Sequence, residues 1–308
     1  MGCLKILTTL SKSTISREIR NNCTDNRYSP KKADVKARIR RSIPRRPAKI
    51  LLQPEIASFV KDGLQRQWSP EQIAGRMRRY ARAALRISHQ SIYRWLWQNK
   101  RSGGTWYRHL RLDNRKRKKQ RGTRGPGARI ANRVMIDDRP ASVSTRRYLG
   151  DWEADTIQGK LGSGRLATLV ERKSRYTMMT YVRSKHAETF NWALLERVRN
   201  SDWLPFRTIT VDNGLEFAGH SELSPALNCA IYFAHPYRSW ERGLNENTNG
   251  LIRQYFPKGV DLLHIPREKV AEVENLLNNR PRKILGYRTP AEVMTALLRR
   301  RQGVRLRT

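Results

Sequence analysis

The second half of the chain alternates β-rich and helical segments in one fixed order, which restricts its possible folds more than any other feature. The expected elements are, in order, strands over residues 148–158, 165–172 and 175–183, a helix over 187–200, strands over 206–214 and 229–234, and a helix over 239–256. With a further helix between the last two strands, the order is β-β-β-α-β-α-β-α. It predicts an α/β domain over residues 148–300 with a mixed five-stranded sheet.

The first expected strand carries acidic residues on one of its two faces. Side chains alternate along a strand, so Trp152, Ala154 and Thr156 share one face, and Asp155 lies on the other with Glu153. The next two β-rich segments are joined only by Lys173-Ser174 and predict a hairpin. This element order is that of a ribonuclease-H-like fold.

The chain is strongly basic, and the charge is unevenly distributed. Its 308 residues include 63 Lys and Arg against 26 Asp and Glu, a formal net charge of +37. Residues 1–150 hold 38 of these basic and 9 of these acidic residues. A single basic run usually marks a solvated surface, but an excess along much of the chain indicates a nucleic-acid partner.

Cysteine content and hydropathy bear on the compartment. Cys3, Cys23 and Cys229 have neither disulfide-framework nor zinc-finger spacing, which fits a reducing cytoplasm. No apolar stretch approaches the roughly 20 residues of a membrane span. Ile6 stands where a myristoylation signal requires Ser or Thr. We expect a cytoplasmic protein with no membrane partner.

The front half is expected to form all-α DNA-binding modules. Residues 1–50 predict a partial helix-turn-helix and a basic stretch, and residues 51–100 a helix-turn-helix domain. Residues 101–147 contain the run RKRKKQRGTRGPG and predict a basic flexible linker. Residues 301–308 predict a basic tail.

Residues 51–100 contain two helix-start signals. Ser69 precedes Pro70 and lies three residues before Gln72, which predicts a capped helix with an apolar stripe of Ile73, Met77 and Tyr80. After a break near residues 82–86, a second helix is expected to begin at Ser88, with Ile92, Trp95 and Leu96 facing inward. The residues expected to contact DNA from this second helix are Ser88, His89, Gln90, Ser91 and Arg94. An ordinary helical hairpin is the alternative.

A second recognition helix is expected over residues 13–19. Only the twelve residues MGCLKILTTLSK precede it, and they barely supply the first helix that such a module packs on. We therefore expect this module to be truncated or to have a wrongly placed start, which bears on recognition of specific DNA ends.

Three acidic residues in the second half are candidate metal ligands. Asp155 in the first strand and Asp212 at the end of the fourth can lie side by side at the sheet centre, and Glu246 can approach from the following helix. Two divalent ions about 3.5–4 Å apart activate an oxygen nucleophile and stabilise a leaving oxygen in phosphodiester chemistry. Carboxylates suit Mg²⁺ or Mn²⁺, and the sequence does not separate these ions.

The helix that carries Glu246 has polar residues along the same stripe. Arg242, Asn249 and Arg253 fall four residues before, three after and seven after Glu246, so they share its face. We expect these three residues and Lys258 to contact DNA beside the metal ions.

The stretches WEADT, VDNG and WERGLNENTNGLIRQYFPKG resemble the DDE transposases and retroviral integrases, above all the IS-thirty family of insertion sequences. The interval of 33 residues between Asp212 and Glu246 and the segment LNNRPRKILGYRTPAEVM are also similar to that family. The resemblance covers about residues 60–295. It implies that Asp155, Asp212 and Glu246 hold the metals, in an integrase-type core.

The same resemblance implies a bacterial, nucleoid-associated protein, and it implies a reaction and its partners. The reaction is cleavage at the inverted repeats of the element, followed by joining of the 3′-hydroxyl to target DNA. Double-stranded DNA is the expected partner, and a homo-oligomer on DNA is expected because two element ends must meet. A truncated copy that binds DNA without cutting and a nuclease that degrades DNA or RNA are the alternatives.

Other polar residues near the candidates are given supporting or ordinary roles. Glu153 is expected to support the ligands rather than to bind metal, and Asn213 with Gly214 to shape the turn that presents Asp212. Asp151 and Glu216 are expected to be surface or loop acids. Glu241 is explained by the helix dipole, and His235 by a structural position at a strand end.

Overall fold

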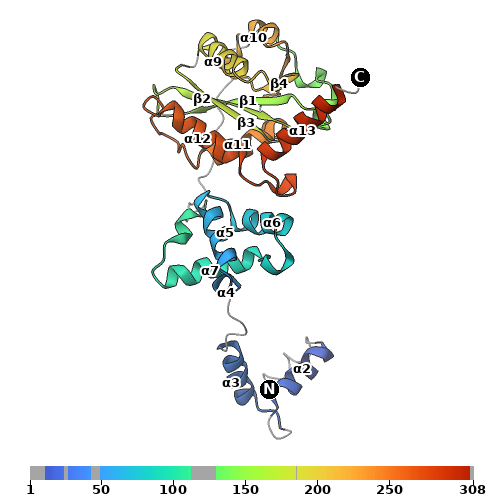
Figure 1. Ribbon diagram of the computed structural model, residues 1–308, viewed down its shortest axis with the longest axis vertical. Helices are drawn as coiled ribbons and strands as arrows, with labels where there is room; N and C mark the ends of the chain where they lie inside the picture. The colour runs from blue at the N-terminus through green and yellow to red at the C-terminus, as the bar shows by residue number, and fades with distance from the viewer. Residues whose placement is uncertain are drawn as a thin grey trace. The chain divides into compact units, whose positions relative to one another are not determined.

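The computed structural model describes residues 11–23, 27–42, 49–111, 130–184, 186–236 and 238–305 (Figure 1). The chain divides into two compact units, one ending at Gln53 and one beginning at Pro54. The expected first helix of the N-terminal module at residues 1–10, the basic run at 115–127 and the end of the tail at 306–308 lie outside the described residues. No helix among the described residues is both long and apolar enough to cross a membrane.

The described residues of the first unit form the helices α2 (Lys12–Asn22), α3 (Pro30–Ser42) and α4 (Lys49–Leu52). Helix α2 contains the segment 13–19 that was expected to be helical. It begins at Ser11, whose hydroxyl accepts a hydrogen bond of 3.3 Å from the Thr14 amide.

The second unit opens with the helices α5 (Pro54–Gln65), α6 (Pro70–Tyr80) and α7 (His89–Arg101) and the short 3₁₀ helices η1 (Ala83–Leu85) and η2 (Trp106–His109). Both helix starts are as expected. Gln72 N donates to Ser69 Oγ at 3.2 Å while Ser69 N donates to Gln72 Oε1 at 2.9 Å, and Ser88 caps α7. That α6 and α7 act as a helix-turn-helix stays a prediction.

The expected apolar stripe of α6 is wrong at one position. Ile73 and Met77 are buried, but the Tyr80 side chain is 58% exposed. The Arg76 and Arg79 guanidinium groups lie 4.2 and 5.5 Å from the Tyr80 ring centroid. An aromatic face attracts cations, so this ring is retained at the surface by its charged neighbours.

The α/β domain is built on one five-stranded sheet. Its strands are β1 (Asp151–Gln158), β2 (Arg165–Glu171), β3 (Thr177–Val182), β4 (Thr208–Val211) and β5 (Ala230–Phe233). Their order is β3-β2-β1-β4-β5, antiparallel among the first three strands and parallel from β1 through β4 to β5. This mixed sheet fits a ribonuclease-H-like domain. The hairpin turn is longer than expected and contains Arg175 with a φ of 65°.

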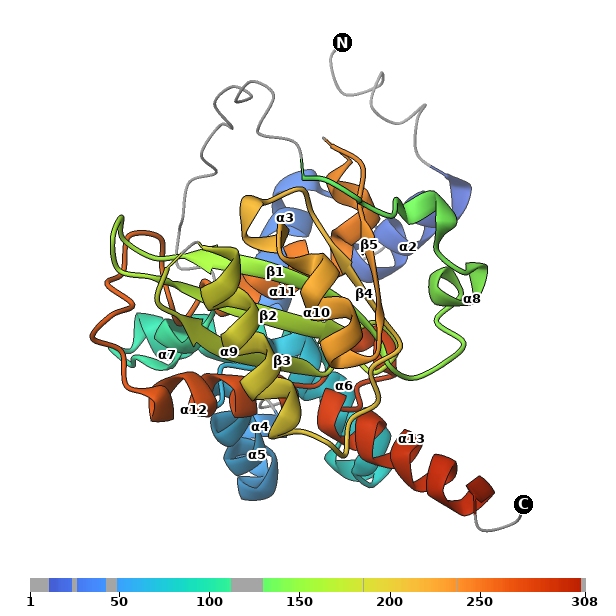
Figure 2. The same ribbon diagram turned by 90° about the horizontal axis from the view of Figure 1, so that it is seen from above.

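Helices cover both faces of the sheet (Figures 1 and 2). Helices α9 (Ala187–Arg199) and α10 (His220–Leu227) pack on one face, and α11 (Gly243–Ile252) and α12 (Arg267–Asn278) on the other. Trp152 and Ala154 belong to the apolar cluster on the α9 side, whereas Ile157 belongs to that on the α12 side. The two faces of β1 are therefore divided as the sequence predicted.

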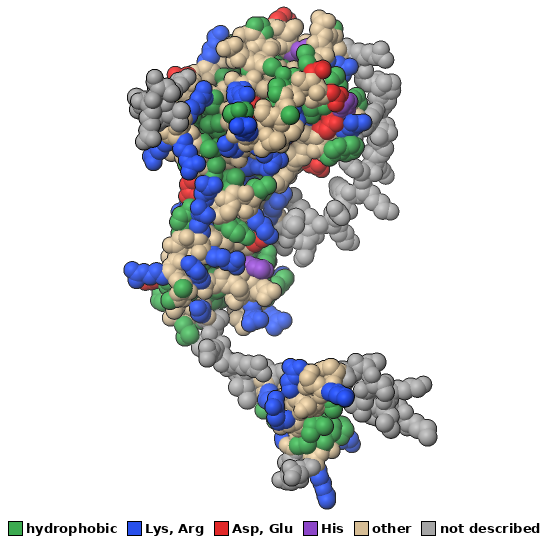
Figure 3. Space-filling model, turned by 90° about the vertical axis from the view of Figure 1, so that its right-hand side faces the viewer, with side chains coloured by type: hydrophobic (Ala, Val, Ile, Leu, Met, Phe, Trp, Pro, Cys, Tyr) green, Lys and Arg blue, Asp and Glu red, His purple; other side chains and the backbone are tan. Residues whose placement is uncertain are grey.

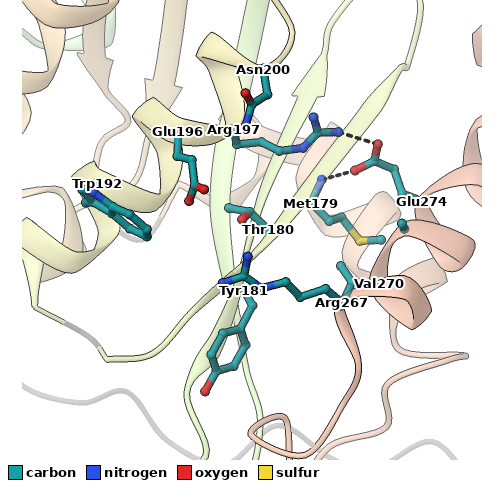
Figure 4. A pocket seen from close by; sticks show the side chains of 11 residues that line it. Met179, Thr180, Tyr181, Trp192, Glu196, Arg197, Asn200, Arg267, Val270 and Glu274 are labelled. Carbon is teal, nitrogen blue, oxygen red and sulfur yellow. Dashed lines mark hydrogen bonds and ion pairs between the residues drawn. The ribbon is translucent and has the colours of Figure 1, made fainter.

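Strand β3 forms an edge of the sheet, and α12 covers it (Figure 4). Glu274 accepts a hydrogen bond of 2.6 Å from the Met179 amide and one of 2.7 Å from Arg197. Asn278 Oδ1 accepts one of 2.8 Å from the Thr177 amide. These side chains occupy backbone donors that another chain could otherwise pair with. A cavity of about 360 Å³ lies between α9 and α12 at this edge.

The segment expected to be a basic linker differs from the prediction in its last part. The expected linker 101–147 is not a linker from residue 130 onward: Ile130 and Val143 are buried, and Met135 pairs with Phe233 at the sheet edge. The short helices η3 (Ile136–Asp138) and α8 (Ala141–Ser144) lie in this segment. The charged residues and glycines that indicated a linker are concentrated before residue 128. The apolar residues after this point have a sheet to pack on.

The bounds of the helix expected over 239–256 and of the expected tail also differ. The helix expected over 239–256 begins as the 3₁₀ helix η5 (Ser239–Arg242), and α11 ends at Ile252. Pro257 disfavours a helical conformation at Phe256 and so limits the helix. After the 3₁₀ helix η6 (Lys283–Leu285), α13 (Pro290–Arg305) continues into the expected tail.

Candidate active site

Asp155 and Asp212 lie opposite each other on neighbouring strands. In the parallel pairing of β1 with β4, Asp151 is opposite Thr208 and Glu153 is opposite Thr210. Continuing the same register by two residues sets Asp155 opposite Asp212, directly after β4. Paired residues of parallel strands direct their side chains to the same face, so the two carboxylates share the face covered by α11.

Arg242 joins the two carboxylates. Its Nη2 lies 3.0 Å from Asp212 Oδ2, and its Nη1 lies 3.6 Å from Asp155 Oδ2. Side-chain exposure is 16% for Arg242, 19% for Asp155 and 35% for Asp212. The two acids therefore face one shared and partly dry space that holds a positive charge.

Helix α11 contributes a second contact to Asp155. Asn249 Nδ2 donates a hydrogen bond of 2.7 Å to Asp155 Oδ2, while the Thr156 amide donates one of 2.8 Å to Asp155 Oδ1. The other amide atom of Asn249, Oδ1, is buried without a hydrogen-bond partner among the described residues. An acceptor that lacks a donor is costly when buried, so the site has an oxygen available beside Asp155.

Glu246 is exposed and forms no hydrogen bond or ion pair within the described chain. It lies on α11 between Arg242 and Asn249, the two residues that reach Asp155. Within the described residues, no three His, Cys, Asp or Glu side chains are gathered closely enough to hold a metal ion. The structure thus brings Asp155 and Asp212 together but does not cluster Glu246 with them.

The pKa of Asp155 is raised above its ordinary value. Burial is the largest cause, and the negative charge of Asp212 adds to it, whereas Arg242 and the hydrogen bonds from Thr156 and Asn249 lower the pKa. Burial and a like charge both disfavour the ionised form. A cation in the shared space therefore favours the ionised form of Asp155.

Glu153 fixes the start of α11 against β1. Its side chain is buried at 1% exposure and forms an ion pair with Arg172. Glu153 Oε2 also accepts a hydrogen bond of 3.2 Å from the Asn245 amide in the first turn of α11. Burial raises the pKa of Glu153, and Arg172 opposes this shift. These contacts place Glu153 behind the site, away from solvent.

Two acids that were expected to be ordinary surface or loop residues are enclosed. Asp151 is fully buried and accepts a hydrogen bond of 3.0 Å from Thr208 Oγ1. Glu216 has a 13% exposed side chain that accepts hydrogen bonds from Thr156 Oγ1 at 2.6 Å and Arg165 Nη1 at 3.2 Å. Their partners come from segments far along the chain, so no local sequence pattern signals this burial.

The turn after Asp212 depends on its glycine. Gly214 has a φ of −68°, which any residue adopts, but a Cβ there would lie 2.9 Å from Asp212 Oδ1 and 2.7 Å from Glu216 Oε2. The Gly214 amide donates a hydrogen bond of 2.9 Å to Asp212 Oδ1. Asn213 is tied to the end of β5 by a hydrogen bond of 2.7 Å to the Ala234 carbonyl. Both residues therefore lie in the turn that presents Asp212.

Glu241 and His235 pair with each other. His235 Nδ1 lies 3.0 Å from Glu241 Oε1, and its Nε2 lies 2.9 Å from Asp137 Oδ2. Glu241 belongs to η5, which is too short for a strong dipole, so its pairing with His235 explains it better than the expected dipole effect.

The residues expected to contact DNA fall into two groups. The first group is open to solvent. Lys258 in the α/β domain is exposed, and Ser91 on α7 is partly exposed. The other expected contacts at the start of α7 are all exposed, namely Ser88, His89, Gln90 and Arg94. In the second group, Arg242 and Asn249 contact the carboxylates, and Arg253 donates to the Gln158 carbonyl at 2.8 Å. Lys and Arg side chains are prominent across the face shown in Figure 3.

Comparisons with known proteins agree on one family. The chain is 42% identical to the transposase for insertion sequence element IS4351 of Bacteroides fragilis, an alignment that covers 92% of this chain and 86% of that protein. It is 38% identical to the transposase InsI for element IS30A of Escherichia coli, over 92% and 76% of the two chains. It is 32% identical to the transposase for element IS1086 of Cupriavidus metallidurans, over 93% and 86%.

No family model matches the chain. Among solved structures, the catalytic core domain of BIV integrase is 18% identical, with a TM-score of 0.38, over 48% of this chain and 95% of that one. The assignment therefore depends on the relatives at 32–42% identity, which match almost the whole chain. The protein belongs to the IS30 family of insertion-sequence transposases.

Proposed function

We propose that this chain cuts DNA at the inverted repeats of an insertion sequence and transfers the freed 3′-hydroxyl end to target DNA, with Asp155, Asp212 and Glu246 as metal ligands. The observation that carries the proposal is the pair of carboxylates, Asp155 and Asp212, that meet across one guanidinium at the sheet centre. Family membership supplies the reaction class.

The donor atoms around this space fit two hard divalent cations, Mg²⁺ or Mn²⁺. Asp155 and Asp212 offer carboxylate oxygens to a shared space, and Asn249 Oδ1 is a buried oxygen without a donor among the described residues. Such ions prefer oxygen ligands. When bound, they supply activation of the attacking oxygen and stabilisation of the leaving oxygen. Glu246 joins the set by rotation of its exposed side chain from the same stripe of α11.

The remaining residues hold this arrangement. Arg242 favours the ionised form of Asp155 while no metal is bound and then turns to the negative charge of the DNA backbone. Asn249 orients Asp155 through its amide, and Glu153 fixes the first turn of α11 through the Asn245 amide. The supporting side chains are thereby themselves held by hydrogen bonds, as a site with fixed geometry requires.

DNA is the partner in this proposal. The exposed polar end of α7 contacts the inverted repeats, and the large positive charge supplies affinity for phosphates throughout. The protein acts as a homo-oligomer, because two element ends have to be held together for joining.

Asp212→Asn tests the proposal. The substitution removes the negative charge while retaining the shape of the side chain, so Mg²⁺-dependent nicking of terminal-repeat DNA is expected to disappear while DNA binding persists. Asp202→Asn is a matched control, since Asp202 is an exposed acid outside the site. Nicking by Asp212→Asn at the rate of Asp202→Asn would refute the ligand assignment.

A further inference from the structure

A basic cavity of about 450 Å³ lies on the other side of α11 from Asp155. Its lining includes the side chains of Arg111, Arg175 and Arg282, together with Gln72 from α6 and Asn247 and Thr248 from α11. Given 100° of rotation per residue, Asn247 lies about 160° and Thr248 about 100° around the helix from Asn249, so both face away from the side that contacts Asp155. The cavity is thus about one helix diameter, roughly 10 Å, from the carboxylates.

Among the described residues, no acidic side chain forms an ion pair with Arg111, Arg175 or Arg282. Within the described chain, the Arg175 side chain forms no hydrogen bond or ion pair. In the part of the chain that the structure describes, the Arg111 side chain donates only to the Gly250 carbonyl at 2.9 Å, and the Arg282 side chain only to the Leu277 carbonyl at 3.3 Å. Arg282 Nε is buried with no hydrogen-bond partner among the described residues. Arg175 and Arg282 are thus partly enclosed without the carboxylate that usually accompanies a buried charge.

Arg280 adds a further unpaired cation behind the cavity. Its side chain is 2% exposed and, among the described residues, donates only to neutral oxygens: the Gln72 and Gln254 side chains at 3.1 and 3.2 Å, and the Gln67 carbonyl. Lys283, by contrast, lines the cavity but is paired with Glu71 at 2.7 Å. The excess charge therefore resides on the arginines.

The arginines also repel one another. The pKa of Arg282 is lowered to about 9 by burial and by the charges of Arg280, Arg175 and Arg111. The pKa of Arg175 is lowered to about 10 by burial first and then by Arg146 and Arg172, against the opposing effect of Glu153 and Glu171. An anion in the cavity would relieve both effects, since opposite charge favours the protonated form.

We infer that this cavity binds one phosphate of the DNA backbone, at a fixed distance from the carboxylate site and on the opposite side of α11. Guanidinium groups form paired hydrogen bonds with phosphate oxygens, and Thr248 and Asn247 provide neutral donors beside them. The inference rests on the proposed function only in taking DNA as the bound polymer. Contacts of α6 with the α/β domain through Gln72 and Arg280 complete the lining, so the same phosphate is held by both parts of the second unit.

The test is DNA binding without divalent ions, which makes it independent of strand cleavage. Affinity for a labelled double-stranded DNA is measured by fluorescence anisotropy over a range of salt concentrations for Arg175→Gln and Arg282→Gln. Arg199→Gln is the control, because Arg199 is an exposed arginine at the end of α9 on the other face of the sheet. All three variants lose the same charge.

We expect each cavity variant to bind DNA about tenfold more weakly, with a salt slope reduced by about 1. Arg199→Gln should change neither by a comparable amount. Equal losses in all three variants would overturn the inference, because they would reflect net charge alone.

A second measurement covers the case in which a variant folds poorly. Inorganic phosphate should raise the melting temperatures of the unsubstituted protein and of Arg199→Gln. It should raise the melting temperature of Arg282→Gln by a smaller amount. Without phosphate, Arg282→Gln should melt no lower than the unsubstituted protein, because the lost cation has no acidic partner. If phosphate raises the melting temperature as expected but the cavity variants bind DNA with unchanged affinity, the cavity binds a free anion and not DNA. That result would contradict the inference. Failure of the nicking test with Asp212→Asn would leave these results unaffected.

Discussion

Arg242 Nη2 lies 3.0 Å from Asp212 Oδ2, and this contact defines the centre of the candidate active site. The same guanidinium lies 3.6 Å from Asp155, on the strand next to Asp212. A positive group is thus held between two acids that come from segments 57 residues apart in the chain. The proposal that metal ions bind here depends on this shared space.

Gly214→Ala should disable the site without unfolding the protein. The new Cβ would meet Asp212 Oδ1 at 2.9 Å and Glu216 Oε2 at 2.7 Å, so the Asp212 carboxylate has to shift. Small displacements of catalytic groups cost about a hundredfold in rate, which nicking of terminal-repeat DNA would measure. Gly243→Ala is the control, since a Cβ at Gly243 meets no atom within 4 Å. Similar nicking rates for the two variants would contradict this role for Gly214.

The strand acids could be predicted from the sequence because the signal is local. Alternation along β1 separated Asp155 from Trp152 and Ala154, and the apolar run before Asp212 placed it at the end of a strand. The face assignments agree with the two apolar clusters. Period-two patterning thus identified which side chains share the α11 side of the sheet.

Contacts between distant segments could not be predicted in this way. Glu216 is enclosed by Arg165 and Thr156, and Asp151 by the pairing of β1 with β4, so neither is a surface acid. The burial of an acid depends on partners that local patterns do not reveal. The ion pairs of Arg242 with both carboxylates were likewise not predicted, although its place on the Glu246 stripe of the helix was. That Arg242 contacts DNA stays a prediction.

Glu153→Ala should destabilise the α/β domain by about 3 kcal/mol, because removing one partner of a buried ion pair leaves the other uncompensated. Here Arg172, at 8% exposure, would lose its carboxylate and the Asn245 amide its acceptor. Urea unfolding would measure the change in the free energy of unfolding. Glu188→Ala, at an exposed position of α9, provides the reference. A loss no larger than that of Glu188→Ala would show that the pair does not support the site.

The contact between α6 and α13 should weaken in acid. Arg76 donates a hydrogen bond of 2.8 Å to Glu292 and thereby lowers the pKa of Glu292 below its ordinary value of 4.5. A lowered carboxyl pKa contributes stability that is present above the ordinary pKa of 4.5 and is lost as pH falls through the folded-state pKa. Because the Glu292 side chain is 37% exposed, we expect a contribution of at most about 1 kcal/mol.

Comparison of unfolding free energies between neutral pH and a pH well below the ordinary carboxyl pKa would test this contact. The unsubstituted protein should lose more stability than Glu292→Gln over this range, whereas Glu268→Gln, at an exposed position of α12, should behave like the unsubstituted protein. An identical pH dependence in all three proteins would exclude a role for Glu292.

Arg94→Gln should weaken DNA binding while leaving the fold intact. Arg94 is exposed on α7 beside the polar residues of its first turn, whereas Trp95 and Leu96 anchor the helix in the core. Loss of a base contact costs about 1–3 kcal/mol of binding free energy and relaxes the sequence preference at one base pair. Loss of a phosphate contact weakens binding to all DNA sequences alike. Binding to terminal-repeat and unrelated DNA would distinguish these outcomes. Arg66→Gln is the control, because Arg66 is an exposed arginine directly after α5 that pairs with Asp62. An equal loss of DNA affinity in both variants would contradict DNA contact by α7.

Metal binding is the most direct test of the central claim. Titration of the DNA-free protein with Mn²⁺, followed by electron paramagnetic resonance, measures the number and affinity of bound ions without any reaction. We predict that Mn²⁺ binds the unsubstituted protein and Asp202→Asn, and that Asp155→Asn and Asp212→Asn each bind it at least about tenfold more weakly, with a smaller loss in Glu246→Gln. Unchanged Mn²⁺ binding when Asp155 and Asp212 are both replaced by Asn would contradict the account.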